Sequence, residues 1–246
     1  MTKSHRSAGG SRRGLAIVVA LAIGAVPVRA ALAADESGAS PNQTVQNLRK
    51  LYSDPHVQQL LAHTAGESPV MVHNPCPAAR YRLGNGISVV RPIAFNSAGA
   101  LTAGAWVQAI DEDGCGARRN LNVLILLKDP KNLEAGPLFP GSTRAEPLLQ
   151  RDAFQYAMTT GFLAVTAAGE AKTCKIAYVT NTTFIGQERT PAVAGKGLPW
   201  REVWRLAFCS KQAAVPMHFI PDATGTTISA GPNTAVKVEP LAAKPN

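Results

Sequence analysis

The sequence lacks any apolar run long enough to span a membrane. Residues 15–28 form a run of 14 residues that includes Pro27, whereas a spanning helix needs about 20. Further along the chain, residues 121–127 are the best candidate, and this run has only seven residues. The sequence therefore predicts no transmembrane segment in the mature chain.

Acidic residues are absent from the first 34 positions, which instead hold five basic ones. A basic stretch, the apolar run, and then the small residues Ala31 and Ala33 are the three parts of an export signal. We therefore predict a signal peptide over residues 1–33 and an exported protein, periplasmic or secreted. Arg12 and Arg13 also fit a twin-arginine signal, but no cofactor site is visible that would need this route, so the Sec route is favoured.

Without this signal, the excess of positive charge is modest. Of the 25 lysines and arginines, 20 remain against 16 acidic residues, which gives a net charge of +4 in place of +9. Domains that bind nucleic acid carry a much stronger basic surface, so we expect no nucleic-acid partner. An envelope protein or a small ligand is the expected partner.

Motifs of the common catalytic sites are also missing. The mature chain holds no GxSxG, SxxK, HExxH or phosphate-binding glycine loop, and no CxxC pair that would indicate zinc. The acidic residues 111–113 could bind calcium, but Cys115 stands where an EF-hand loop needs an oxygen ligand, and Asn122 replaces the closing glutamate. We therefore expect no metal and no cofactor, and we interpret the acidic run as a solvated turn.

Four cysteines are present, and all follow the predicted signal: Cys76, Cys115, Cys174 and Cys209. An even number in an oxidising compartment indicates two disulfides. Three connectivities are possible, and we predict Cys76–Cys115 and Cys174–Cys209 because each pair lies within one local stretch of the chain. Each bond would close a loop of about 35–40 residues and contribute roughly 3–4 kcal/mol.

Hydrophobic periodicity predicts an α+β fold, with a mostly antiparallel β-sheet of six to nine strands and two helical segments packed on it. The helical segments are residues 45–64, interrupted at Pro55, and residues 146–160, which end before Gly161. Strands are expected at residues 87–95, 100–110, 118–127, 162–167, 172–183 and 226–229, and as a hairpin within 200–220.

One globular domain is expected over residues 45–230. A polar, flexible lead-in at residues 34–44 would precede it. A tail at residues 231–246, with three prolines among mostly polar and small residues, is expected to be disordered. The connection over residues 129–147 is rich in proline and glycine and is interpreted as a surface loop.

The clearest local pattern lies in residues 200–220, where apolar and polar residues alternate on both sides of 210–213. A turn at that place would put Phe208 opposite Val215 and Arg205 opposite His218. Pro216 would move its strand towards a sheet edge.

The candidate site residues are hypotheses drawn from side-chain chemistry alone. Imidazole titrates near neutral pH, so the candidates for acid–base catalysis are His218, His56 and His63. Aromatic rings suit an apolar or sugar-binding groove, and the candidates for such a groove are Trp200, Trp106 and Tyr178.

The leading interpretation is a non-catalytic envelope module that binds a partner or a small ligand, because the exported, disulfide-bonded fold shows no catalytic motif. Two alternatives stay open. A periplasmic hydrolase with a histidine-centred site needs an acidic or hydroxyl side chain within reach of a histidine. A carrier of a small apolar molecule needs an enclosed apolar cavity between sheet and helix.

Overall fold

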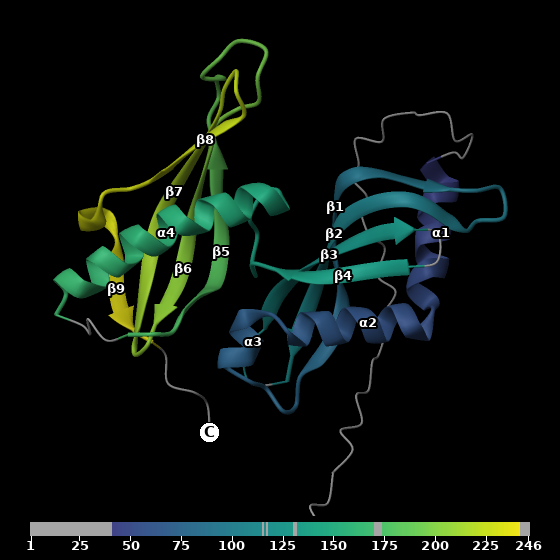
Figure 1. Ribbon diagram of the computed structural model, residues 1–246, viewed down its shortest axis with the longest axis horizontal. Coiled ribbons are helices and arrows are strands. Elements are labelled where there is room, and N and C mark those ends of the chain that lie inside the picture. The colour runs from purple at the N-terminus through teal and green to yellow at the C-terminus, as the bar shows by residue number, and fades with distance from the viewer. Residues whose placement is uncertain (1–40, 115, 117, 130–131, 170–173, 242–246) are drawn as a thin grey trace, which may run out of the picture.

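The computed structural model describes residues 41–114, 116, 118–129, 132–169 and 174–241. They form two antiparallel sheets, each preceded in the chain by helices (Figure 1). The first half contains α1 (Pro41–Ser53), α2 (Pro55–Gly66), α3 (Pro69–His73), β1 (Arg80–Phe95), β2 (Leu101–Asp113), β3 (Arg119–Asp129) and β4 (Asn132–Leu138). The second half contains α4 (Pro147–Ala167), β5 (Ala177–Gln187), β6 (Trp200–Phe208), β7 (Lys211–Pro221), β8 (Thr226–Ala230), a 3-10 turn (Asn233–Ala235) and β9 (Lys237–Pro240). The predicted α+β class is confirmed.

Both sheets are meanders in which strands adjacent in sequence pair with each other. Sheet A has the order β1-β2-β3-β4, and sheet B has the order β5-β6-β7-β8, with β9 also paired to β7. Each sheet has an apolar core of its own, one centred on Trp106 and the other on Trp204. The single domain expected over residues 45–230 stays a prediction, and within it the structure shows two halves, each with its own apolar cluster. The predicted signal at 1–33 lies outside the described residues.

The joint between the first two helices is as predicted. Asp54 caps α2 by accepting a hydrogen bond from the His56 backbone N–H at 2.8 Å, and Pro55 is the first helical residue. The lead-in is shorter than expected, because α1 already begins at Pro41. Both helices pack on sheet A, where the indole N–H of Trp106 donates to the Tyr52 hydroxyl at 2.7 Å. Among the described residues, no helix is both long and apolar enough to cross a membrane.

The apolar strand β3 lies inside sheet A, as its continuous apolar run predicts. Its outer neighbour β4 falls within residues 129–147, which were wrongly interpreted as a loop. Pro137 and Gly136 gave the loop signal, but proline is tolerated in an edge strand, and β4 is the edge of its sheet.

Helix α4 is longer than predicted, and residues 162–167 are helical rather than a strand. Gly161 was expected to end the helix. It lies instead at the helix face that packs on sheet B, where a Cβ would come within 2.9 Å of Phe208 Cε2. Gly161 is therefore a close-packing glycine, which lets α4 approach β6.

The hairpin of β6 and β7 has the predicted faces but a different register. Its turn is at Cys209 and Ser210, so His218 lies opposite Arg201 and not opposite Arg205. The observed partners differ from the predicted ones by four residues. Because an even shift keeps every side chain on its face, alternation alone cannot reveal it.

A covalent bond holds this turn in place. Cys209 has a φ of 50°, in the left-handed region, and is bonded to Cys174 across 35 residues of sequence. In this register, Phe208 pairs with Lys211 and not with Val215. The predicted Cys174–Cys209 disulfide is confirmed. Cys76 is also disulfide-bonded, while Cys115, its predicted partner, lies outside the described residues.

The segment predicted to be a disordered tail is ordered over residues 231–241. It contains the 3-10 turn and β9, which pairs with the Lys211–Ala214 end of β7. The strand β8 pairs with the other end of β7. Pro216 lies where the change from β8 to β9 occurs, and its carbonyl accepts a hydrogen bond from the Gly231 N–H at 2.8 Å. On this side of β7, neither β8 nor β9 forms a strand pair with Pro216. The break between the two pairings explains how proline is accommodated in an inner strand.

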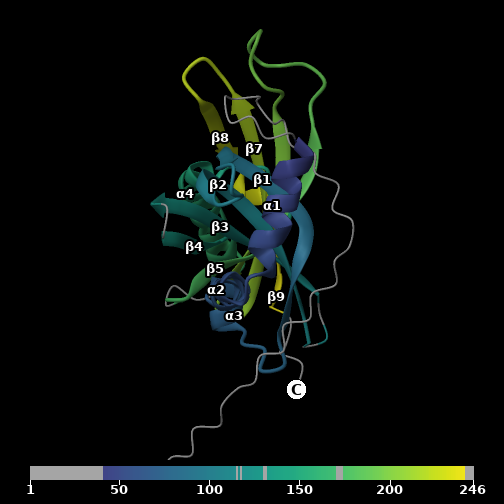
Figure 2. The same ribbon diagram turned by 90° about the vertical axis from the view of Figure 1, so that its right-hand side faces the viewer.

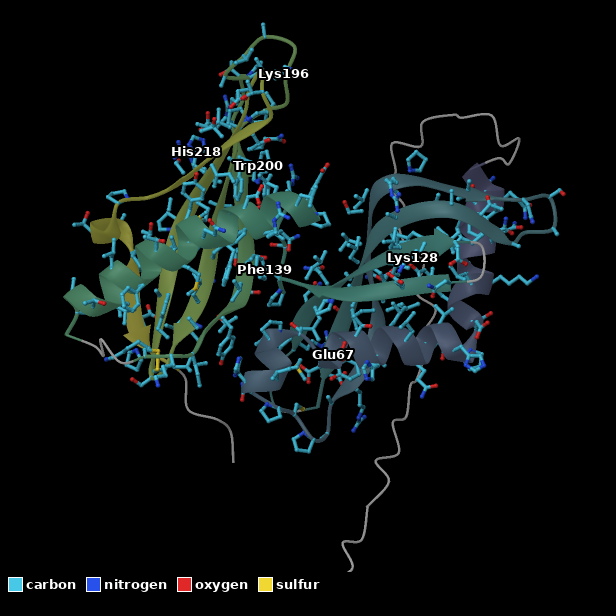
Figure 3. The ribbon with its side chains drawn as sticks, viewed as in Figure 1. Glu67, Lys128, Phe139, Lys196, Trp200 and His218 are labelled. Carbon is cyan, nitrogen blue, oxygen red and sulfur yellow. A yellow bond between two sulfur atoms is a disulfide. The ribbon has the colours of Figure 1, made fainter. Side chains whose placement is uncertain are left out.

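Among the described residues, the halves are joined by the connector and by a helix–strand contact. The connector, residues 139–146, runs from β4 to α4, and α3 packs on β5 through a stack of the His73 and Tyr178 rings at 4.6 Å. Figure 2, turned by 90°, shows α2 end-on below sheet A and α4 near the other sheet. Phe139, labelled in Figure 3, lies at the start of the connector and packs against Trp204 with ring centroids 5.3 Å apart.

Candidate functional site

A cleft with a volume of about 500 Å³ lies where the connector passes sheet A. Its floor is the face of β1, β2 and β3 opposite the helices, because Val107 and Asn122 alternate with the buried core residues of their strands. Its wall is formed by residues 141–147 and by Gln150 of α4. Binding pockets for small molecules commonly have volumes of about 300–1,000 Å³, so the cleft is large enough to hold a ligand.

The connector is fixed to sheet A by one side-chain amide and by a backbone hydrogen bond. The Asn122 amide donates to the carbonyls of Phe139 and Gly141 at 2.8 and 3.0 Å. The Gly141 N–H donates to the Asn120 carbonyl at 2.8 Å. A Cβ on Gly141 would lie 2.0 Å from the Thr182 carbonyl oxygen, so only glycine allows this close approach.

The same segment is also fixed to sheet B, through Thr182 of β5. The Thr182 hydroxyl donates to the Pro140 carbonyl at 2.7 Å and accepts from the Thr143 N–H at 3.2 Å. Backbone bonds join Thr182 to Pro140 and Ser142 as well. With both sheets holding it, the wall of the cleft is preorganised, which lowers the entropic cost of binding.

A buried carboxylate completes this anchoring. Glu202 of β6 is 1% exposed. Its Oε1 accepts from the Arg144 backbone N–H at 2.7 Å and the Trp200 indole at 2.9 Å, and its Oε2 accepts from the Trp204 indole at 2.7 Å. Three N–H donors thus compensate for the burial of this charge.

The cleft combines apolar side chains with small polar groups, and two charged residues, Arg144 and Glu146, also line it. Ser88 on β1 and Val107 on β2 are cross-strand partners on the floor. Asn122, Ser142 and Thr143 add amide and hydroxyl groups. Arg144 is turned towards sheet B, where its guanidinium lies 3.8 Å from the centre of the Phe184 ring. Such a surface suits a ligand or peptide segment with an apolar side and several hydrogen-bonding groups.

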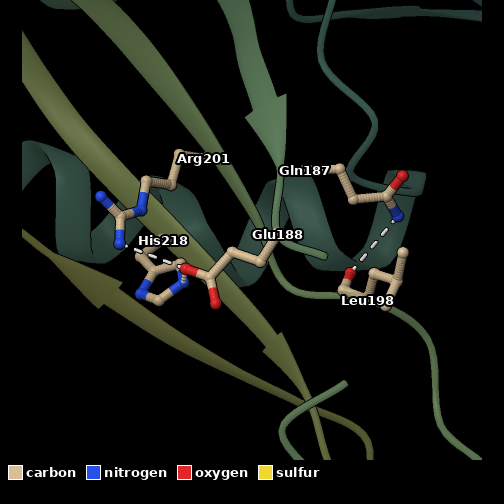
Figure 4. A network of polar contacts seen from close by, with 5 residues as sticks. All are labelled: Gln187, Glu188, Leu198, Arg201 and His218. Carbon is tan, nitrogen blue, oxygen red and sulfur yellow. Dashed lines mark hydrogen bonds and ion pairs between the residues drawn. The ribbon is translucent and has the colours of Figure 1, made fainter. Parts of the chain in front are cut away.

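A second polar cluster surrounds His218 at the end of sheet B that carries the loop after β5 (Figures 3 and 4). His218 Nε2 is buried and lies 3.1 Å from Glu188 Oε1, at ion-pair distance but without the alignment of a hydrogen bond. The Arg201 guanidinium donates to the same oxygen at 3.1 Å. The amide of Gln187 reaches the Leu198 carbonyl at 3.5 Å and so closes the base of the loop.

The other two candidate histidines lie far from this cluster in the fold. His56 and His63 are exposed on α2, and His63 Nδ1 lies 3.6 Å from the exposed carboxylate of Glu67, one turn further along the helix. The structure therefore brings no pair of candidate histidines together.

The three aromatic candidates do not share a groove. Trp106 is fully buried in the core of the first half, and Tyr178 lies under His73 where the halves meet. Trp200 is half-buried and stacks on Phe219 with ring centroids 4.9 Å apart. Each ring has a packing role in the described structure.

The sequence analysis missed both fully buried glutamates. Glu112 is 0% exposed; its Oε2 lies 3.4 Å from the Arg119 guanidinium, and its Oε1 has no hydrogen-bond partner. Burial raises the pKa of the Glu112 carboxyl, and the nearby Arg119 charge opposes part of that rise. Burial also raises the pKa of Tyr81, which pairs with Glu112 across the strands, and the Glu112 charge adds to the effect.

Strand alternation in the sequence held a signal for both of them. Trp200, Glu202 and Trp204 are two residues apart, so strand alternation puts all three on the buried face. Glu112 likewise alternates with Ile110 and Gln108 on the inner face of β2. In the described part of the chain, no three His, Cys, Asp or Glu side chains come close enough to hold a metal ion.

Comparison with known families, with curated proteins and with solved structures found no match. No relative's activity therefore bears on this chain.

Proposed function

We propose that the protein is an exported, non-catalytic envelope module that binds a partner or small ligand in the cleft between sheet A and the connector. The observation that carries this proposal is the cleft of about 500 Å³ with a wall fixed by hydrogen bonds to both sheets. The Cys174–Cys209 disulfide is typical of proteins that mature in an oxidising compartment and supports export.

In the described part of the chain, the pocket between helix and sheet does not support the alternative of a carrier for an apolar molecule. The apolar pocket between α2 and sheet A, lined by Leu61, Leu83 and Ile110 among others, has a volume of only about 20 Å³. This is the space of about one water molecule.

The binding proposal is tested by filling the cleft. Ser88 is exposed on the cleft floor, so Ser88→Trp places a large ring there without changing a buried residue. The matched control is Ser97→Trp, an exposed serine at the tip of the β1–β2 hairpin. We expect uncharged fragments bearing amide and hydroxyl groups, screened by NMR against the ¹⁵N-labelled chain, to shift the resonances of Val107 and Asn122.

Comparing fragment affinities for the filled variant and for the control decides whether the cleft is the binding site. We expect the same fragments to bind the Ser97→Trp protein with unchanged affinity and to lose at least tenfold in affinity for the Ser88→Trp protein. If no fragment shifts the cleft resonances, or if both variants bind like the wild type, the cleft is not the binding site.

A further inference from the structure

The strand β1 forms one edge of sheet A, so one side of its backbone has no strand partner among the described residues (Figure 1). The cleft reaches this edge, because the consecutive residues 86–90 of β1 all line it. Successive side chains of a strand point to opposite faces, and one face alone would contribute only every second residue. The continuous run therefore indicates that the cleft opens along the backbone edge of β1.

We propose that the cleft binds an extended acidic peptide segment of a partner protein, which pairs with residues 86–90 of β1 as a fifth strand of sheet A. This inference rests on the proposed function, because it names the partner of the same cleft. An edge strand presents N–H and C=O groups that can pair with another chain. In this mode of recognition the main-chain hydrogen bonds supply affinity, and alternate side chains supply specificity.

Irregularities of β1 limit the pairing to a short stretch. Residues 87–89 pair with residues 106–108 of β2 in unbroken register, whereas the register shifts between Leu83 and Ile87 and again between Val89 and Arg91. Because a bulge bends its strand and interrupts the ladder, a long strand cannot continue past these two places. The edge therefore offers a site for one short segment, and it is protected against open-ended association with other strands.

The charge beside the cleft favours an acidic segment. The β2 partners of Ser88 and Arg91 are two residues apart, so both side chains lie on the face of the sheet that forms the cleft floor. Arg91 is exposed, and none of the described carboxylates forms an ion pair with it. The strand β1 contains three arginines and no acidic residue. A carboxylate on the incoming strand can therefore pair with Arg91.

The two charged residues of the cleft wall already have favourable surroundings. The Arg144 guanidinium lies over the Phe184 ring at 3.8 Å. Glu146 is the N-cap residue of α4, where the helix dipole stabilises a negative charge. Arg91 is thus the cation beside the cleft that lacks such a contact within the described chain, and it is the group that the peptide carboxylate is expected to meet.

The cleft floor selects the other side chains of the segment. In a strand paired with β1, every second side chain lies on the same face as Ser88. Val107 is half-buried on this floor, and Val90, which also lines the cleft, is 36% exposed. The expected segment therefore turns small apolar side chains towards the cleft and carries an aspartate or glutamate at the position beside Arg91.

The test starts from a phage-displayed library of random heptapeptides selected on the immobilised wild-type chain. The Ser88→Trp protein is present in solution as a competitor, which removes peptides that bind outside the cleft. We expect the selected peptides to contain an acidic residue, and we expect a synthetic copy of the strongest one to lose about tenfold in affinity for Arg91→Glu, because like charges then meet. Arg49→Glu, at an exposed arginine of α1, should bind this peptide like the wild type.

Methylation of the peptide backbone distinguishes strand pairing from binding through side chains alone. When a strand is paired on one side, the N–H groups of alternate residues point to the partner strand and the remaining ones point away. We expect N-methylation of one alternate set to abolish binding to the wild-type chain. N-methylation of the other set should leave the affinity nearly unchanged.

Three results would each overturn the strand-pairing inference: no acidic peptide is selected, Arg91→Glu binds like the wild type, or both methylated sets have the same effect. The proposed function survives such a result if uncharged fragments still shift the resonances of Val107 and Asn122 and lose affinity for Ser88→Trp. If these fragments fail as well, the proposed function is wrong together with the inference.

Discussion

At the scale of single residues, the two buried glutamates show how the supply of donors decides the cost of burying a charge. Glu202 receives three N–H donors on its two oxygens, and this satisfied carboxylate serves as an anchor for the connector. Glu112 has one guanidinium at 3.4 Å and an oxygen without a hydrogen-bond partner. Burial therefore dominates at Glu112 and raises the pKa of its carboxyl.

This raised pKa predicts a specific pH dependence. The pKa of the Glu112 carboxyl is higher in the folded protein than in the unfolded chain. From about pH 4.5 upward, the folded protein therefore keeps the Glu112 proton more often than the unfolded chain does. The contribution of Glu112 to the free energy of unfolding is then largest at low pH and is lost as the pH rises through the folded pKa. We expect the free energy of unfolding of Glu112→Gln to lack this decrease with rising pH, as measured by urea denaturation between pH 4 and pH 8.

The exposed Glu67 on α2 provides the control for this measurement. Glu67→Gln should show the same decline in stability with pH as the wild type. Parallel curves for the wild type and Glu112→Gln would mean that the Glu112 carboxyl titrates alike in the folded and unfolded states, contrary to the account.

At the scale of secondary-structure elements, the joint between two helices was predictable from local signals, whereas features that depend on packing were not. The break between α1 and α2 was predictable because Asp54 and Pro55 act within a few residues of themselves. Gly161 was misread as a helix end because glycine is typical of helix ends, and its true role depends on Phe208, 47 positions further along. The prediction of the hairpin register failed for a related reason. Apolar alternation determines which face a side chain lies on, but it is equally compatible with any shift of the strand pairing by an even number of residues.

The packing role of Gly161 predicts a loss of stability where helix propensity predicts a gain. Alanine is favoured over glycine inside a helix by about 1 kcal/mol, but in Gly161→Ala the new methyl group would meet Phe208 at 2.9 Å. We expect a net destabilisation of about 1–3 kcal/mol from overpacking, measured by chemical denaturation. Gly136→Ala in β4, where a Cβ meets nothing within 4 Å, should not show this loss, and a stabilised Gly161→Ala protein would contradict the packing role.

The disulfide at the hairpin turn predicts a further effect. Cys209→Ser removes a bond that closes a loop of 35 residues, so we expect a loss of about 4 kcal/mol in the free energy of unfolding. The thiol of Cys174 should then react with a maleimide probe in the native protein. The double variant Cys174→Ser/Cys209→Ser should be destabilised equally but remain unlabelled, whereas an unreactive Cys174 in the single variant would contradict the pairing.

At the scale of the whole molecule, the cleft is a product of how the two halves are joined. Each half repeats one plan, helices followed by an antiparallel meander, and the connector between them is tied to Asn122 on one side and to Thr182 and Glu202 on the other. These partners are 17 to 58 residues apart in the sequence. The fold class and the helix joint could be predicted from local patterns, but the cleft could not, because none of its defining contacts is local.

The most direct test of the binding account is to isolate the protein from the cells that produce it and identify what accompanies it. Wild type, Ser88→Trp and Ser97→Trp would be purified in parallel and compared by quantitative mass spectrometry. The account predicts at least one molecule or protein that is recovered with the wild type and with Ser97→Trp and is depleted at least tenfold with Ser88→Trp. Recovery of the same companions in the same amounts with all three proteins would contradict it.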